Sequence, residues 1–117
     1  MRRRGTLFDM ELMTIPQAAE VLGVPVTRVH QYIRDGQLVG LRDANGVRCI
    51  PASFLQDGAI LKSLPSVITQ LRDARYADDD IIEWLFRTDD SLPGTPVEAL
   101  RANRGTEVKR RAQVAGF

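Results

Sequence analysis

The stretch LGVPVTRVHQYIRDGQL, residues 22–38, decides the fold class of this 117-residue chain. Val26, Val29 and Ile33 follow the i, i+3, i+7 spacing that gives an α-helix one buried face. Pro25 suits the first position of that helix, and Gly36 is placed to end it. The stretch therefore predicts a short helix with one apolar side and one polar side.

A second short helix is predicted directly before this one. The sequence TIPQ, starting at Thr14, is a capping box in which Thr14 and Gln17 satisfy each other's backbone N–H groups. Pro16 falls in the first turn, where its missing N–H costs nothing. Gly23 ends the helix. Two helices joined by so tight a link predict a helix-turn-helix.

The residues after these helices predict a β-hairpin. Two strand-like runs, Leu38–Arg42 and Val47–Ile50, flank a turn that contains Asn45 and Gly46. Asn-Gly is a strong hairpin signal because both residues tolerate positive φ. A hairpin that directly follows a helix-turn-helix is a wing.

Helical patterning resumes after a joint at residues 58–63. One helix is expected to start near Pro65, and another at the three aspartates Asp78–Asp80, with Trp84 as its central packing residue. A third is expected from Pro96 to a stop at Gly105, followed by a last helix at Glu107–Val114. The predicted fold is mainly α with a small β-hairpin wing, a winged helix-turn-helix followed by a small helical bundle. The expected division is a basic flexible tail (1–12), a winged helix-turn-helix DNA-binding domain (13–57) and a C-terminal helical domain (62–115).

Composition limits the class of protein and its surroundings. A hydrophobic content of 44% and a charged content of 26% are normal for a globular protein. The basic N-terminus has no long apolar segment behind it, and no apolar run approaches the ~20 residues of a membrane span. The single cysteine excludes an internal disulfide and favours a reducing cytosol. We therefore expect a cytoplasmic protein, nucleoid-associated if it binds DNA, without contact to a membrane.

Net charge of +1 conceals an uneven distribution. Residues 1–50 carry seven basic against five acidic side chains, residues 51–90 four against eight, and residues 91–117 five against two. The ends are basic and the middle is acidic. Local positive potential, rather than overall charge, is what a nucleic-acid binder needs.

The polar side of the 25–35 helix carries the residue types that read base edges. Arginine pairs with guanine, glutamine with adenine, and threonine contacts a phosphate or a thymine methyl. The wing supplies two arginines to the backbone, and the N-terminal arginines suit a minor groove or phosphates. The expected DNA-binding residues are Thr27, Arg28, His30, Gln31, Arg34, Arg42, Asn45, Arg48, Arg2, Arg3 and Arg4.

Each of these features also has a structural explanation. The polar helix side is then a solvated face, the wing arginines protect an edge strand, and the tail only solubilises. Asp78–Asp80 are best explained as caps of a helix N-terminus rather than a metal site. No nucleophile–base pair or phosphate-binding glycine loop is recognisable, so we expect no catalytic residue, no metal, no cofactor and no enzyme activity.

The segment from Leu22 to Leu38, with the VRCIP run after it, resembles the winged helix-turn-helix of the MerR and excisionase-like superfamily. Pro25 departs from the serine or threonine often found at that helix start, so the side-chain cap is lost. From about Leu12 to Gln113 the chain is similar to an actinobacterial, mycobacterial-type DNA-binding protein family. The most specific pieces are the WLF run at Trp84, PVxAL at Pro96 and VxRRAQ at Val108. This resemblance implies DNA binding through the winged half.

The functional expectation is a DNA-binding protein that acts in transcription regulation or as a nucleoid-associated factor. Its partner is double-stranded DNA, with a homodimer or a protein partner through the C-terminal helical domain. One alternative is an antitoxin-like or adaptor module whose main role is protein–protein interaction. A further alternative is an excisionase-like architectural factor that bends DNA.

Overall fold

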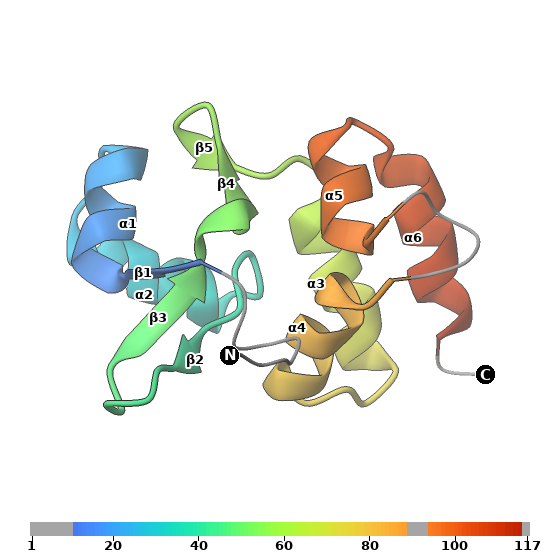
Figure 1. The fold of residues 1–117 in the computed structure, drawn as a ribbon, viewed down its shortest axis with the longest axis horizontal. Coiled ribbons are helices and arrows are strands. Elements are labelled where there is room, and N and C mark those ends of the chain that lie inside the picture. Colours follow the sequence, from blue (N-terminus) through green and yellow to red (C-terminus); the bar gives the residue numbers. More distant parts are fainter. Residues whose placement is uncertain (1–10, 89–93, 116–117) are drawn as a thin grey trace, which may run out of the picture.

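The computed structural model describes residues 11–88 and 94–115, and Figure 1 shows a winged half and a helical half side by side. Within these residues, helices dominate and strands are short, so the predicted fold class is confirmed. The elements in chain order are β1 (Leu12–Thr14), α1 (Ile15–Leu22), α2 (Val26–Arg34), β2 (Leu41–Arg42), β3 (Arg48–Pro51), the 3-10 helix η2 (Ala52–Phe54), β4 (Leu55–Gln56), β5 (Ala59–Ile60), α3 (Leu64–Asp73), α4 (Asp78–Phe86), α5 (Pro96–Arg101) and α6 (Gly105–Val114).

The predicted helix-turn-helix is present as α1 and α2. The capping box forms, because Thr14 N donates to Gln17 Oε1 at 2.8 Å and Gln17 N donates to Thr14 Oγ1 at 3.3 Å. Gly23 takes the left-handed conformation, with φ +70°, and ends α1. Pro25 lies one position before α2 rather than at its first position. A bulkier side chain at Gly23 would be strained, so the tight turn between the helices depends on this glycine.

A three-stranded antiparallel sheet in the order β1-β3-β2 packs against α1. The strand β1 was not predicted, since the sequence places its first residue, Leu12, in the basic tail. It pairs with β3 through Leu12 opposite Pro51 and Thr14 opposite Cys49. The wing strand predicted to start at Leu38 was too long, because only the two residues of β2 pair with β3. The preceding residues 38–40 are buried but form no strand.

The wing turn is built around Asp43. Its carbonyl accepts from Gly46 N at 2.9 Å, and its Oδ1 accepts from Asn45 N at 2.8 Å and Val47 N at 2.9 Å. Gly46 has φ +80°, whereas Asn45 does not adopt the positive φ that asparagine tolerates. The Asp43 carboxylate thus accepts hydrogen bonds from the backbone N–H groups of the turn, as in an Asx turn.

The joint predicted at residues 58–63 is a second small hairpin, β4–β5. Leu55 pairs with Ile60 and Gln56 with Ala59 across a turn at Asp57 and Gly58. Both turn residues have positive φ, +56° and +77°. This hairpin lies beside α1 at the top of Figure 1 and connects the winged half to α3.

The C-terminal helices begin close to their predicted positions, with two corrections. Trp84 is only half-buried, and the buried residues of α4 are Ile81, Ile82 and Leu85, so its assignment as the central packing residue was wrong. Gly105 is the first residue of α6 rather than the stop of the preceding helix, which already ends at Arg101.

One hydrophobic cluster runs through both halves. Phe54, fully buried, lies 5.9 Å from the ring of Phe86 on α4, measured between ring centroids. Arg101 on α5 donates to the carbonyl oxygens of Ser53 and Leu55, both at 2.9 Å. No helix in the part of the chain that the structure covers is long and apolar enough to cross a membrane. The shared hydrophobic cluster fixes the position of the helical half relative to the winged half.

Candidate nucleic-acid interface

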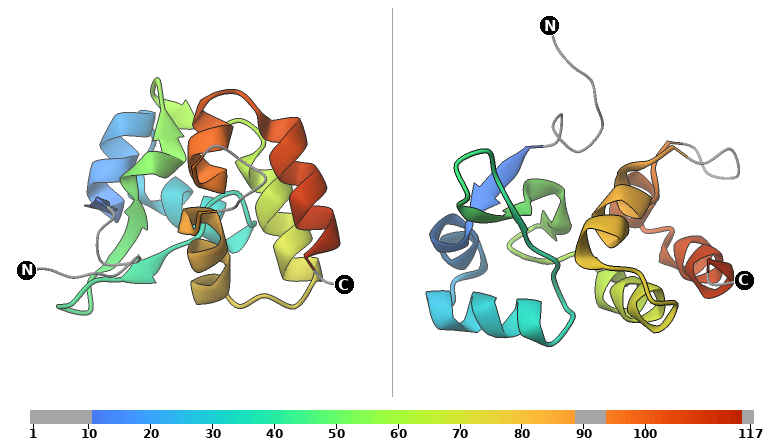
Figure 2. Two further views of the ribbon diagram at one scale, coloured as in Figure 1. Left: turned by 45° about the vertical axis from the view of Figure 1, so that its right-hand side comes forward. Right: turned by 90° about the horizontal axis from the view of Figure 1, so that it is seen from below.

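The polar side of α2 is open. Val29 and Ile33 are buried at 0% and 4% exposure, whereas the side chains on the opposite side of the helix are exposed. Seen from below in Figure 2, no helix of the C-terminal half passes in front of α2. The helix therefore presents a free polar ridge. The exposed residues of this ridge are Thr27, Arg28, His30, Gln31 and Arg34.

The spacing of the ridge residues explains why they lie together. At ~100° per residue, Thr27, Gln31 and Arg34 fall within about 60° of one another on the helix. His30 borders this stripe on one side, and Arg28 lies further round on the other. The stripe from Thr27 to Arg34 is about 2 turns or roughly 10 Å long, which fits within a major groove about 12 Å wide.

The first turn of α2 has no side-chain cap. Pro25 precedes the helix and forms no side-chain capping hydrogen bond. Serine or threonine at this place would accept from a first-turn backbone N–H; here Arg28 N donates to the Pro25 carbonyl oxygen at 2.9 Å instead, so the available N–H groups are those of Val26 and Thr27. Backbone N–H groups at a helix N-terminus bind phosphate well, because they donate along the helix dipole.

The wing places two arginines face to face. Arg42 on β2 and Arg48 on β3 are directly opposite each other in the antiparallel pair, and both are exposed. Arg42 Nη1 donates to the carbonyl oxygen of Gly46 at 2.8 Å, which holds its side chain along the wing. A Cβ added at Gly40 would lie 3.3 Å from Arg48 Nε, so the Arg48 side chain crosses that glycine. Asn45 is exposed in the turn.

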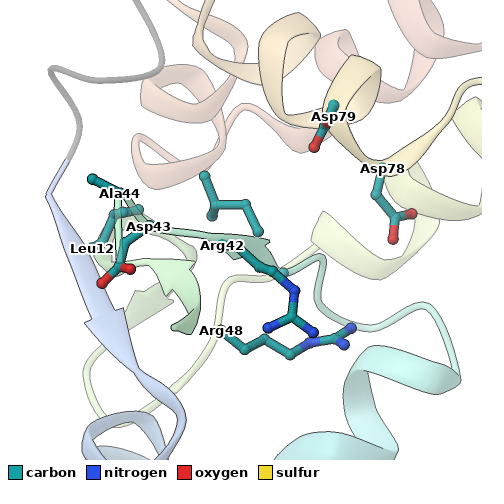
Figure 3. A pocket seen from close by; sticks show the side chains of 9 residues that line it. Leu12, Arg42, Asp43, Ala44, Arg48, Asp78 and Asp79 are labelled. Atoms are coloured by element: carbon teal, nitrogen blue, oxygen red, sulfur yellow. The ribbon is translucent and has the colours of Figure 1, made fainter. Parts of the chain in front are cut away.

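A pocket of about 660 Å³ lies between the wing and the first turn of α4. Figure 3 shows the guanidinium groups of Arg42 and Arg48 next to each other, with Asp78 and Asp79 on the facing wall. The remaining lining is largely apolar. It consists of Leu12, Gly40, Leu41, Asp43 and Ala44.

The sequence did not predict that the aspartates face the wing. Asp78 and Arg42 are 36 positions apart, and no local pattern connects a helix cap with a distant hairpin. The three N-terminal arginines predicted to contact DNA, Arg2, Arg3 and Arg4, lie outside the described residues.

Cys49 is buried in β3 at 3% exposure. Burial raises the pKa of its thiol, and the neighbouring Asp43 carboxylate adds to the effect. The thiol therefore stays protonated at neutral pH and is not activated as a nucleophile. Within residues 11–88 and 94–115, no group of three or more metal-ligating side chains is assembled.

Comparison with known proteins identifies the family. Residues 6–55 match the family model described as DNA-binding protein Rv2175c, wHTH domain, and residues 61–116 match that of the Rv2175c C-terminal domain of unknown function. The DNA-binding protein Rv2175c of Mycobacterium tuberculosis (strain ATCC 25618 / H37Rv) is 42% identical over 121 residues, covering 93% of this chain and 83% of the relative.

A solved structure agrees with these matches. The NMR structure of Rv2175c superposes with a TM-score of 0.85 at 40% sequence identity, over 93% of this chain and 83% of that one. Both halves of the fold are thus shared with this relative, including the arrangement of the helical half. The chain belongs to the Rv2175c family of winged helix-turn-helix proteins.

Proposed function

We propose that the chain binds double-stranded DNA, with α2 in the major groove and the wing on the phosphate backbone. The observation that carries this proposal is the open polar ridge of α2, opposite buried Val29 and Ile33, in a fold whose wing exposes a pair of arginines. The mycobacterial relative is named a DNA-binding protein, which supports the same activity here.

The ridge residues take separate roles in this proposal. Arg34 pairs with guanine O6 and N7, and Gln31 with adenine N6 and N7. Thr27, in the first turn, contacts a phosphate or a thymine methyl next to the uncapped N–H groups. Arg28 and His30 flank these contacts and reach the adjacent backbone.

The two wing arginines repel each other, and both attract a phosphate. Like charges directly opposite on neighbouring strands destabilise a sheet. A phosphate between Arg42 and Arg48 converts that repulsion into two charge-assisted hydrogen bonds. Asn45, at the turn, contributes a further polar contact to the backbone, and Arg2, Arg3 and Arg4 add minor-groove or phosphate contacts.

In the cell we place the protein in the cytoplasm as a transcription regulator or nucleoid-associated factor, acting by binding rather than by catalysis. Base-reading side chains on α2 favour a preference for particular sequences, since phosphate contacts alone carry no sequence information.

Titration of DNA binding against salt tests the activity. A fluorescently labelled genomic-fragment pool and a random duplex are titrated with the full chain at several salt concentrations. Displacement of several counterions predicts a linear fall of log affinity with log salt, with a slope of about −0.9 per phosphate contact. Sites selected from the pool are then footprinted to locate the protected bases.

The same titration separates the proposal from its main rival. A protein-binding adaptor shows no duplex binding near physiological salt, and that result overturns the proposal. Control variants must keep their fold, which the thermal transition monitors. Arg87→Gln is a matched control for each wing or α2 arginine, because it removes one exposed positive charge from the end of α4, where Arg87 pairs with Glu83 at 2.7 Å.

A further inference from the structure

The three consecutive aspartates at the start of α4 differ in what they contact. Asp80 Oδ2 accepts from Ala77 N at 3.2 Å and closes the first turn. Asp78 Oδ1 accepts from Arg72 Nη2 at 3.2 Å. Among the described residues, the Asp79 carboxylate makes no hydrogen bond or ion pair, and it lines the pocket opposite the wing. Helix capping and the Arg72 contact therefore engage two of the aspartates, whereas Asp79 interacts with its own helix only through the helix dipole.

Asp79 faces a pair of positive charges that it does not neutralise. Within the described residues, neither Arg42 nor Arg48 forms an ion pair with any carboxylate. Asp79 and the two arginines lie on facing walls of the pocket, and no ion pair among the described residues joins them. At moderate salt, charges interact over a screening length of about 10 Å, which is the scale of such a pocket.

We propose that Asp79 sets the DNA affinity of the wing from the C-terminal half. In the free protein, the Asp79 carboxylate attracts the guanidinium groups of Arg42 and Arg48. In the complex, it repels the DNA phosphate that binds to these two arginines. Both effects weaken DNA binding and favour duplex positions that keep phosphates away from α4. Asp79 is thus a positioning residue for the DNA backbone, and this inference rests on the proposed DNA binding.

The position of Asp79 gives the C-terminal half a role in DNA recognition without a contact to DNA. Because Arg42 and Arg48 line the pocket whose facing wall carries Asp79, a phosphate bound to the two arginines faces this carboxylate across the pocket. The affinity is lowered most for duplexes whose backbone continues along the wing toward α4. The repulsion that weakens binding grows as the distance between the Asp79 carboxylate and the nearest one or two phosphates becomes shorter.

The test is a charge-neutral substitution, Asp79→Asn, in the full chain. We expect this variant to bind a duplex about three- to tenfold more tightly than wild type at low salt, with the gain shrinking as salt rises. The Tm of the variant is measured in parallel, because an aspartate in the first turn also stabilises its helix. Tighter binding by a slightly less stable protein excludes improved folding as the cause.

Asp57→Asn is the matched control. It makes the same change in net charge on the β4–β5 turn, at the end of the molecule away from α4 in Figure 1. Asparagine tolerates the positive φ of that position, so the control keeps its fold. Equal gains from Asp57→Asn and Asp79→Asn mean a general charge effect and overturn the inference.

A double substitution tests the link to the wing. If Asp79 acts on the phosphate held by the wing, the gain from Asp79→Asn falls to less than half in an Arg42→Gln, Arg48→Gln background. An undiminished gain contradicts this route. If wild type binds duplex with the expected salt dependence and Asp79→Asn does not differ from it, the inference fails alone. If neither protein binds duplex, the proposed function fails as well.

Discussion

Arg101 Nη1 on α5 donates to the carbonyl oxygen of Leu55 at 2.9 Å, and so joins the helical half to the strand that leaves the winged half. The same nitrogen also reaches the carbonyl oxygen of Ser53 at 2.9 Å. In return, Gln56 Nε2 donates to the Arg101 carbonyl at 3.3 Å. Three backbone carbonyl oxygens thus accept hydrogen bonds from side chains across the junction.

Substitution of Arg101 by alanine is expected to lower the free energy of unfolding by about 1–3 kcal/mol, because two carbonyl acceptors lose a charged donor. Urea unfolding followed by circular dichroism measures the change. Arg87→Ala, which breaks only an exposed ion pair with Glu83, is expected to cost less than about 1 kcal/mol. Equal losses for the two variants would contradict the proposed importance of the junction.

Phe54→Ala is expected to destabilise the whole chain by about 3–5 kcal/mol, because a fully buried ring that contacts Phe86 is lost. Trp84 lies in the other half, so its fluorescence reports whether unfolding is shared. We expect the Trp84 transition to shift together with the circular dichroism transition. A Trp84 transition that stays at the wild-type midpoint would show that the halves unfold separately.

Arg34→Ala is expected to weaken binding to a selected duplex site by about 1–3 kcal/mol through loss of one base contact. Because Arg34 is exposed, the free energy of unfolding should change by less than about 0.5 kcal/mol. Electrophoretic mobility shifts with a selected and a scrambled duplex measure the effect. Wild-type affinity for the selected site would exclude Arg34 from base recognition.

Alkaline pH is expected to destabilise the protein through Cys49. Burial, aided by Asp43, raises the pKa of the thiol in the folded state, so unfolding favours loss of the proton. This contribution is complete below the unfolded pKa of about 8.5 and is lost as pH rises through the higher folded value. The free energy of unfolding, measured from pH 7 to pH 10, should therefore fall more steeply for wild type than for Cys49→Ala. Parallel curves would remove Cys49 as the cause.

Local signals in the sequence predict most helix starts. The capping box at Thr14 and the proline at Pro96 each act within one turn, so neighbouring residues are sufficient to place them. The buried positions of α2 follow from its helical period in the same way. The open side of α2 is predicted for the same reason, because exposure there is the complement of a periodic buried face.

Contacts between distant segments are not predicted in this way. The strand β1 has only three residues and exists because β3 offers it an edge, so its own residues carry little strand signal. Five of the six residues in IIEWLF are apolar, and this run cannot show which face of α4 is buried. Ile81, Ile82 and Leu85 define that face, and Trp84 lies roughly 110° from its centre. The proximity of Asp79 to the wing also depends on this tertiary packing.

The continuous hydrophobic cluster changes how truncated proteins have to be interpreted. A fragment that stops after residue 57 keeps α2 and the wing but uncovers Phe54 and Leu55, which the helical half shields from water. Because such a fragment exposes core residues to water, a loss of DNA binding by it would not show that the missing half contacts DNA. The roles of the two halves are therefore best separated by single substitutions of surface residues in the full chain. Truncation would also disrupt the hydrophobic core that both halves share.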